Sequence, residues 1–361
     1  KPEALHSHCP AVQTGLCYVQ RCHRLSTIVL LGTIRSASVR SYTIEMRPRL
    51  LIAEPDRFSV RALAMLREWA DVEQRRPRAA ELRAAFEQFD IVWLRLGFRV
   101  GADMVRPPVR CRFLVTPVTG LDHIDLDACG QAGIRVVSLR GETEFLRDVR
   151  ATAELTVALA LALIRRLPSA NRSVLEGRWD RDRFPGRELY GKTAAIIGMG
   201  RLGRIAAACF RAFGMQVIGY DPYAPFSEEQ AEPMPTLESA LGRADLVSLH
   251  VNYHPGTRHL IGAAAFSAMK PGAVLINTSR GGVLDEAALL EALRSGKLGG
   301  AALDVLEGEP DIDADHPLIT YAREHDNLLI TPHIGGNTIE SFEKTELFLA
   351  SKVRETWSAM R

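Results

Sequence analysis

The chain has 361 residues, 47% of them hydrophobic, so it is long enough for about two domains that each bury a core. Its formal net charge of +2 gives no reason to expect a nucleic-acid or acidic-membrane partner. No apolar run approaches the roughly 20 residues that span a bilayer. The cysteines form no C-x-x-C pair and no metal-ligand spacing with histidine, so we expect free thiols, a reducing compartment and no metal site.

Residues 1–48 differ in composition from the rest of the chain. No acidic residue lies between Glu3 and Glu45, while arginine and serine recur, as in transit peptides. Another interpretation is that the functional protein begins at Met46 and that nothing before it is structured. We therefore expect an N-terminal extension, disordered or targeting. We expect a cytoplasmic protein unless this extension directs it to an organelle.

From residue 49 onward, short apolar runs alternate with segments of helical spacing. In the first unit we expect strands at residues 50–53, 91–96, 113–115 and 134–139, and a helix at residues 59–69. A longer helix is expected from residue 151 to about residue 167, where Pro168 ends it. Strands that alternate with helices predict a parallel, doubly wound sheet.

The second unit repeats this alternation. We expect strands at residues 193–197, 216–220, 246–251, 273–277, 300–305 and 328–331. Six strands separated by helical patterns are typical of a dinucleotide-binding Rossmann domain. The predicted fold class is therefore α/β, with two Rossmann-like doubly wound parallel-sheet domains and a cleft between them.

The segment from Gly198 to Gly203 matches G-x-G-x-x-G, a pattern that is weak by itself because glycine pairs also mark ordinary turns. Here an apolar strand precedes it, a helical pattern follows, and the next strand ends at Asp221. Gly198 permits the tight turn, Gly200 lets the backbone approach a pyrophosphate, and Gly203 lets the helix pack on the sheet.

The residues around this loop also predict which dinucleotide binds. The first helical turn, with Arg201 and Leu202, offers free N–H groups to phosphates. Asp221 can accept hydrogen bonds from the adenosine ribose, and its charge repels a 2′-phosphate. The expected cofactor is therefore NAD rather than NADP.

Three further strands end in residues that can carry chemistry. Arg280 follows the strand at 273–277, Glu309 follows the strand at 300–305, and His333 follows the strand at 328–331. Ligands in open α/β sheets bind at the carboxyl ends of strands, so these side chains are placed to converge on one crevice. Taken singly, they would be a surface arginine, a loop acid and a structural histidine.

The segments INTSRGGVLD (276–285), GAALDVLEGEP (300–310) and LITPHIGG (329–336) follow the glycine loop in this order. With TGLDHIDL (119–126), they resemble the D-isomer-specific 2-hydroxyacid dehydrogenases. The resemblance implies NAD-dependent interconversion of a D-2-hydroxy acid and its 2-keto acid. His333 would be the general acid–base residue, Glu309 would fix its tautomer, and Arg280 would bind the substrate carboxylate. Glu309 rather than Glu307 matches the family's spacing.

The resemblance implies further site residues and an organisation of the chain. It implies that two further residues line the substrate pocket, Arg95 and Gly120. It implies that the cofactor is also bound by Thr119, Thr278, Ser279, Asp304, Gly335 and Gly336. It implies a substrate-binding domain of residues 49–148 plus 335–361, an NAD-binding domain of residues 149–334, closure about a hinge, and a homodimer. Because the chain ends soon after the last motif, we expect no regulatory domain of the kind found in longer phosphoglycerate dehydrogenases.

The chain departs from the family's pattern near the expected substrate pocket. His123 stands where asparagine is common, and Asn252, next to the expected adenine pocket, stands where proline is common. Gly97 stands where phosphoglycerate enzymes often have a second arginine, which argues against a phosphorylated substrate. The segment 141–149 is also longer than usual. These departures leave the substrate open and do not affect the expected hydride transfer.

Two other functions are compatible with the same residues. NAD(H)-sensing transcriptional co-repressors share the fold and the three residues, and in them binding matters more than turnover. Phosphite oxidation by a close relative would need only a different anion in the same pocket. Rapid turnover of a small keto acid would argue against the sensor.

Overall fold

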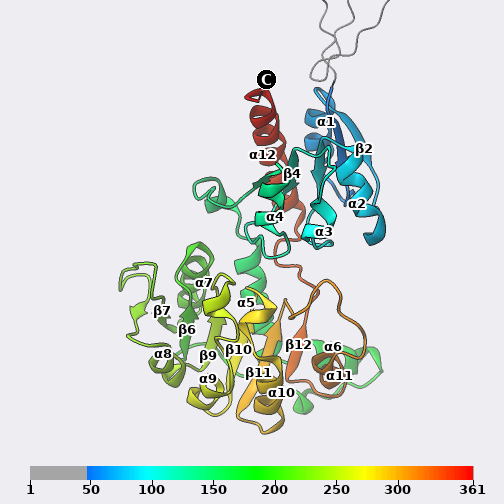
Figure 1. Ribbon diagram of the computed structural model, residues 1–361. Coiled ribbons are helices and arrows are strands. Elements are labelled where there is room, and N and C mark those ends of the chain that lie inside the picture. The colour runs from blue at the N-terminus through cyan, green and yellow to red at the C-terminus, as the bar shows by residue number, and fades with distance from the viewer. Residues whose placement is uncertain (1–46, 361) are drawn as a thin grey trace, which may run out of the picture. The chain divides into compact units, whose positions relative to one another are not determined.

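The computed structural model describes residues 47–360, and from Pro48 onward these residues form one compact unit. The expectations for residues 1–46, which include three of the cysteines, lie outside the described residues. Two parallel sheets with helices around them form the unit, which confirms the predicted fold class (Figure 1).

The first sheet has five parallel strands in the order β2-β1-β3-β4-β5. They are β1 (Arg49–Ile52), β2 (Asp71–Gln74), β3 (Ile91–Trp93), β4 (Phe113–Thr116) and β5 (Arg135–Ser138). Its helices are α1 (Val60–Arg67), α2 (Ala79–Gln88), α3 (Ala102–Val105) and α4 (Leu126–Gln131). All four expected strands are present. The edge strand β2 was missed because its sequence, Asp-Val-Glu-Gln, has no apolar run.

The C-terminal helix α12 (Ile339–Ser358) returns to this first sheet (Figure 1). Its buried residues Leu349 and Val353 pack in one cluster with Leu50 of β1 and Trp93 of β3. A stretch after residue 335 therefore shares a core with residues 49–148, which is the arrangement that the split substrate-binding domain requires.

The second sheet has seven parallel strands in the order β12-β11-β10-β9-β6-β7-β8. They are β6 (Thr193–Ile197), β7 (Gln216–Tyr220), β8 (Glu232–Pro233), β9 (Leu246–Leu249), β10 (Ala273–Asn277), β11 (Leu298–Leu303) and β12 (Leu328–Ile330). Its helices are α7 (Arg201–Ala212), α8 (Leu237–Arg243), α9 (Ala263–Ala268), α10 (Glu286–Arg294) and α11 (Pro317–Glu324). The chain changes direction across the sheet at β6, so the switch point at which such sheets bind ligands lies beside that strand.

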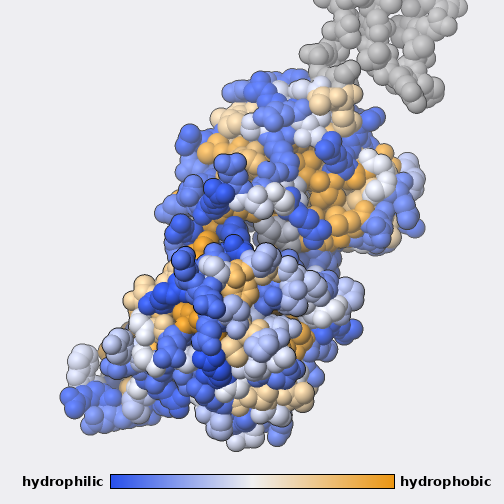
Figure 2. Space-filling view, turned by 90° about the vertical axis from the view of Figure 1, so that its left-hand side faces the viewer, coloured by the Kyte–Doolittle hydropathy of each residue, from blue (hydrophilic) through white to orange (hydrophobic). Residues whose placement is uncertain are grey.

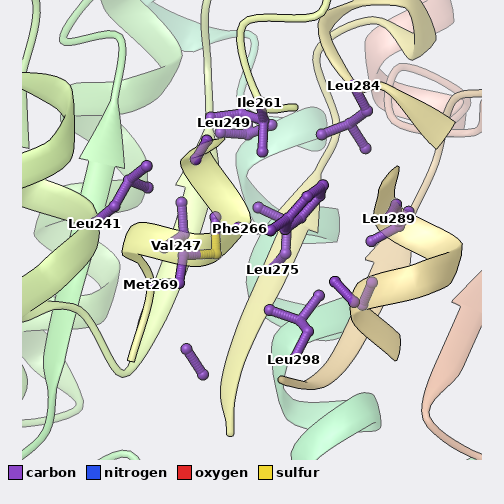
Figure 3. Packing of buried hydrophobic residues seen from close by; sticks show 14 of the residues in the cluster. Leu241, Val247, Leu249, Ile261, Phe266, Met269, Leu275, Leu284, Leu289 and Leu298 are labelled. Carbon is purple, nitrogen blue, oxygen red and sulfur yellow. The ribbon is translucent and has the colours of Figure 1, made fainter. Parts of the chain in front are cut away.

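A buried apolar cluster packs helices against the second sheet (Figure 3). Val247 of β9 and Leu275 of β10 are fully buried and pack in one cluster with Phe266 of α9 and Leu289 of α10. Burial of each such side chain contributes about 1.5–3 kcal/mol to folding. This packing positions the strands, and with them the residues that follow their carboxyl ends.

The long helix expected between the two units is broken into two. Helix α5 (Ala151–Ile164) is followed by Arg165 as its C-cap and by Arg166, which has a left-handed φ of 53°. Helix α6 (Leu167–Leu175) begins directly after Arg166. Pro168 lies in the first turn of α6, where the missing N–H has no intrahelical partner to lose. The expectation that Pro168 ends the helix was therefore wrong, because the backbone of Arg166 makes the break and Pro168 helps to start the next helix.

The surface around these elements carries both polar and apolar side chains (Figure 2). Hydrophilic side chains dominate the face drawn in Figure 2, with smaller apolar patches between them. On and after α6, the large apolar side chains of Leu175 and Trp179 are 79% and 89% exposed. Within residues 47–360, the structure has no helix of sufficient length and apolar character to cross a membrane.

Candidate active site

A cleft of about 1090 Å³ is lined by segments beside both sheets and continues along α6, α11 and β12 of the second. The second sheet contributes Arg280, Glu309 and His333, each from a loop that follows a strand. Segments beside the first sheet contribute Arg99 and His123, together with the neighbours Leu96, Gly97 and Asp122. The structure thus brings the three residues predicted at strand ends together in one cleft.

His333 and Glu309 form a hydrogen-bonded pair. The Nδ1 atom of His333 lies 2.9 Å from Oε1 of Glu309, and the two side chains are 22% and 28% exposed. Arg99 donates to the backbone carbonyl of Glu309 from the first-sheet side of the cleft. Glu307 instead pairs with His259 at 2.9 Å, so it is Glu309 that contacts His333.

Asp304 holds the loop that carries His333. It lies just after β11, is 1% exposed, and accepts hydrogen bonds from the backbone N–H groups of Ile334 at 2.8 Å and Gly335 at 2.7 Å. Its Oδ1 also accepts from the Thr331 hydroxyl at 2.6 Å, and its backbone carbonyl accepts from the His333 N–H at 2.8 Å. Burial raises the pKa of Asp304, although these donors oppose the rise. The expected contact of Asp304 with a cofactor stays a prediction.

Arg280 is held in place from both sheets. Its Nε donates to Oδ1 of Asp122 at 2.8 Å, and its Nη1 donates to the carbonyl of Ser279 at 2.7 Å. Burial raises the pKa of Asp122, but the neighbouring Arg280 guanidinium outweighs burial and leaves that pKa below its usual value. A Cβ at Gly120 would overlap the guanidinium, so only glycine there lets Arg280 lie across the segment.

A buried asparagine organises the turn before Arg280. Asn277 ends β10, donates to the carbonyl of Arg280 at 2.9 Å, and accepts from both the N–H and the hydroxyl of Ser279. The next residue, Thr278, is buried and shares a 2.8 Å hydrogen bond with Thr156 of α5. Thr278 and Ser279 therefore set the backbone of this turn.

The glycine loop has the shape that a dinucleotide requires. Gly198 has a φ of 95° and turns the chain out of β6, and a Cβ at Gly203 would overlap the Gly198 carbonyl. A Cβ at Gly200 would meet no atom, so the backbone there is open to a close-lying pyrophosphate at the N-terminus of α7. Asp221 follows β7, and its Oδ2 accepts from the Met199 N–H at 2.8 Å, which fixes the carboxylate beside the loop. These residues fit the expected cofactor.

A family model described as "D-isomer specific 2-hydroxyacid dehydrogenase, NAD binding domain" matches residues 157–335. The chain is 37% identical to a D-3-phosphoglycerate dehydrogenase of Methanocaldococcus jannaschii over 313 residues. This aligned segment covers 85% of this chain and 57% of that protein. The chain belongs to the D-isomer-specific 2-hydroxyacid dehydrogenase family.

Other members of the family match the chain more evenly. It is 33% identical over 307 residues to a hydroxypyruvate reductase of Thermotoga maritima, covering 85% of this chain and 97% of that protein. The solved structure of a D-lactate dehydrogenase from Aquifex aeolicus, complexed with NAD and lactic acid, superposes with a TM-score of 0.75 at 28% identity, covering 86% and 96% of the two chains. The chain spans little more than half the length of the D-3-phosphoglycerate dehydrogenase.

Two residues expected to bind ligands are engaged elsewhere. Arg95 does not line the cleft, because its guanidinium pairs with Glu346 of α12 at 2.5 Å. Arg201 donates to the carbonyls of Leu146 and Val149, which ties the start of α7 to the connection between the sheets. Their roles in ligand binding stay predictions.

The remaining predicted cofactor positions, Thr119, Leu202, Gly335 and Gly336, are not among the residues that line the cleft. Thr119 is exposed just after β4, Leu202 lies in the first turn of α7, and Gly335 approaches Asp304 closely. A Cβ at Gly336 would meet no atom.

Sequence analysis missed Asp122, Arg99 and Asn277 as site residues. For Asn277 there was a usable signal, since a polar residue that closes an otherwise apolar strand, three residues before Arg280, is expected to have a partner. The partners of Asp122 and Arg99 come from the other sheet, and spacing along the chain carries no such signal.

Gly281 offers a test of how this site is packed. A Cβ there would overlap the Leu306 carbonyl carbon and the Glu307 nitrogen, which belong to the loop that leads to Glu309. We expect Gly281→Ala to lower the free energy of unfolding in urea by about 1–3 kcal/mol, the usual cost of overpacking. The control Gly242→Ala, in α8, places its Cβ 3.6 Å from the nearest atom and should cost nothing. Equal stability of both variants would contradict the close approach.

Proposed function

We propose that this chain is an NAD-dependent dehydrogenase that interconverts a D-2-hydroxy acid and its 2-keto acid. The observation that carries the proposal is the convergence of Arg280 and the His333–Glu309 pair in one cleft. Membership of the D-isomer-specific 2-hydroxyacid dehydrogenase family supports the same reaction. A bound nicotinamide would supply the hydride for reduction of the keto acid.

Arg280 would bind the substrate carboxylate. Asp122 and Ser279 occupy its Nε and Nη1, and Nη2, which lies over Gly120, has no such partner among the described residues. A guanidinium matches the geometry of a carboxylate, and one held by fixed partners loses little side-chain entropy on binding. Arg280 would therefore set the orientation of the acid before any chemistry takes place.

His333 would transfer the proton. Because Glu309 is hydrogen-bonded to Nδ1, Nε2 is the nitrogen that can reach a substrate oxygen. During reduction, Nε2 would give its proton to the carbonyl oxygen as C2 receives the hydride. During oxidation, the same atom would take the hydroxyl proton. Glu309 would act by fixing the tautomer and by stabilising the charged ring.

Two finer assignments belong to this proposal. Asp221, fixed beside the glycine loop, would repel a 2′-phosphate, so NAD rather than NADP is the proposed cofactor. Residues 49–148 plus 335–361 would form the substrate-binding domain, and residues 149–334 the NAD-binding domain. Closure would then bring the first sheet's segments onto the substrate.

The reaction is tested by following NADH oxidation with glyoxylate, pyruvate, hydroxypyruvate and phosphohydroxypyruvate. We expect turnover of at least one acid, faster with NADH than with NADPH. His333→Asn should lower kcat by about 10²–10⁴-fold, the usual contribution of general acid–base catalysis. The matched control His325→Asn should change kcat little, because the His325 ring stacks on Tyr321 and its Nδ1 is hydrogen-bonded to the Tyr321 carbonyl at 2.9 Å.

The outcome also separates this proposal from the NAD(H)-sensing alternative. A sensor would bind NADH tightly and turn over none of the four acids. Turnover that survives in His333→Asn would contradict the assigned proton transfer while leaving the dehydrogenase reaction in place.

We further propose that the chain forms a homodimer through α6 and the segment after it. Leu175 and Trp179 are large, apolar and almost fully exposed, and Tyr190 is 79% exposed. Apolar side chains of this size are stabilised when a second copy covers them. Sedimentation should show a dimer that Leu175→Glu with Trp179→Glu converts to a monomer. The control Val60→Glu, 79% exposed on α1, should stay dimeric. A double variant that stays dimeric would contradict this interface.

A further inference from the structure

Arg201 joins the glycine loop to the connecting segment (residues 141–149), which leads from the first sheet towards α5. Its Nη1 donates to the backbone carbonyls of Leu146 at 3.0 Å and Val149 at 2.5 Å, both in this segment. Arg201 is also the first residue of α7, directly after Gly200 of the glycine loop. One side chain therefore contacts the connecting segment from the helix end at which a dinucleotide pyrophosphate is expected.

Helix α12 fixes the connecting segment to the first sheet. The ring of Phe145 stacks on Phe348 of α12, with centroids 4.0 Å apart. Lys344 of the same helix donates to the Asp148 carbonyl at 3.1 Å. Because α12 packs against the first sheet, the contact that Arg201 makes with this segment is a contact between the two halves of the molecule.

The charge of Arg201 has no anionic partner within residues 47–360. Burial lowers the pKa of its guanidinium, and no carboxylate opposes that shift. Arg201 also occupies the first turn of α7, where the helix dipole favours an anion and disfavours a cation. Its two carbonyl partners use only Nη1, so Nε and Nη2 remain as donors. An anion at this helix end would stabilise the side chain, and a pyrophosphate is such an anion.

We propose that Arg201 is a positioning residue that binds the dinucleotide pyrophosphate and the connecting segment at the same time. Nη1 keeps the two carbonyls, and Nε and Nη2 are the donors left for phosphate oxygens, because a guanidinium is a rigid fork of five donors. Dinucleotide binding thereby orders the connecting segment and couples the glycine loop to the first sheet. This inference rests on the proposed function, since it requires that the glycine loop binds a dinucleotide.

Arg204 provides a matched control in the same helix. Its guanidinium also donates to two backbone carbonyls, those of Met199 at 2.8 Å and Pro225 at 2.7 Å. Both carbonyls belong to loops of the second sheet, so these bonds do not reach the connecting segment. Removal of either guanidinium breaks two bonds to backbone carbonyls, but only removal of Arg201 breaks bonds to the connecting segment.

The test measures amide hydrogen exchange by mass spectrometry on the full chain, without ligand and with saturating ADP-ribose or adenosine. ADP-ribose contains the pyrophosphate, whereas adenosine does not. In the wild type, ADP-ribose should slow exchange in the connecting segment by about tenfold or more, the factor expected from one hydrogen bond to a charged group. Adenosine should leave that segment unchanged. Exchange in the glycine loop reports whether ADP-ribose is bound.

Two variants of Arg201 separate binding from coupling. Arg201→Gln and Arg201→Lys should still bind ADP-ribose, because the N–H groups of the glycine loop remain, but with a Kd raised by about 10–100-fold. At saturation, both should show slowed exchange in the glycine loop and unchanged exchange in the connecting segment. Lysine keeps the charge, but its single ammonium cannot serve both partners. Arg204→Gln should keep slowed exchange in both places.

Other outcomes overturn the inference in distinguishable ways. Slowed exchange in the connecting segment of both Arg201 variants, as in the wild type, would mean that the coupling does not pass through Arg201. Loss of that effect in Arg204→Gln as well, or loss of all ADP-ribose binding in both Arg201 variants, would also contradict the assigned role. If ADP-ribose slows exchange only in the glycine loop of the wild type, this inference alone fails. If it slows exchange nowhere, the proposed dinucleotide site fails with it.

Discussion

The site depends on one buried carboxylate, Asp304. It lies at the end of β11 and ties the Thr331–Gly335 loop to the sheet through the Thr331 hydroxyl and two backbone N–H groups. His333 lies within that loop with a φ of 51°, a left-handed conformation that costs a non-glycine residue about 1–2 kcal/mol. Because the Asp304 bonds surround His333, they can hold this backbone and present the imidazole to Glu309. The strain is located at the residue that we assign to proton transfer, as is common at functional sites.

The two sheets meet in the cleft through contacts that cross it. Arg280 from the second sheet pairs with Asp122 from the first, and Arg99 from the first donates to the Glu309 carbonyl in the second. Each crossing contact therefore involves a residue of the proposed chemistry or its immediate backbone. If the cleft opened and broke both contacts, Arg280 and the Glu309 loop would lose their orienting partners at the same time. Substrate binding and assembly of the site would therefore be coupled.

The sequence allowed the second sheet to be predicted more fully than the first. Six of its seven strands were predicted from apolar runs, and only the two-residue edge strand β8 (Glu232–Pro233), which is exposed and has no apolar run, was missed. The glycine loop, Arg280, Glu309 and His333 all follow strand ends. The polar edge strand β2 and the left-handed Arg166 carry no such pattern. Side-chain partners were the least predictable feature. Arg95 is paired with Glu346, 251 residues away, because α12 returns to the first sheet, and no local spacing indicates this.

The most direct test of the central claim follows the hydride itself. The wild-type protein is incubated with NADH deuterated at nicotinamide C4 and with a 2-keto acid, and the product is examined by mass spectrometry and chiral separation. The account predicts a D-2-hydroxy acid with one deuterium on C2, and no C2 label when unlabelled NADH is used in D₂O. A C2 label taken from the solvent, an L product, or no transfer despite bound NADH would contradict the account.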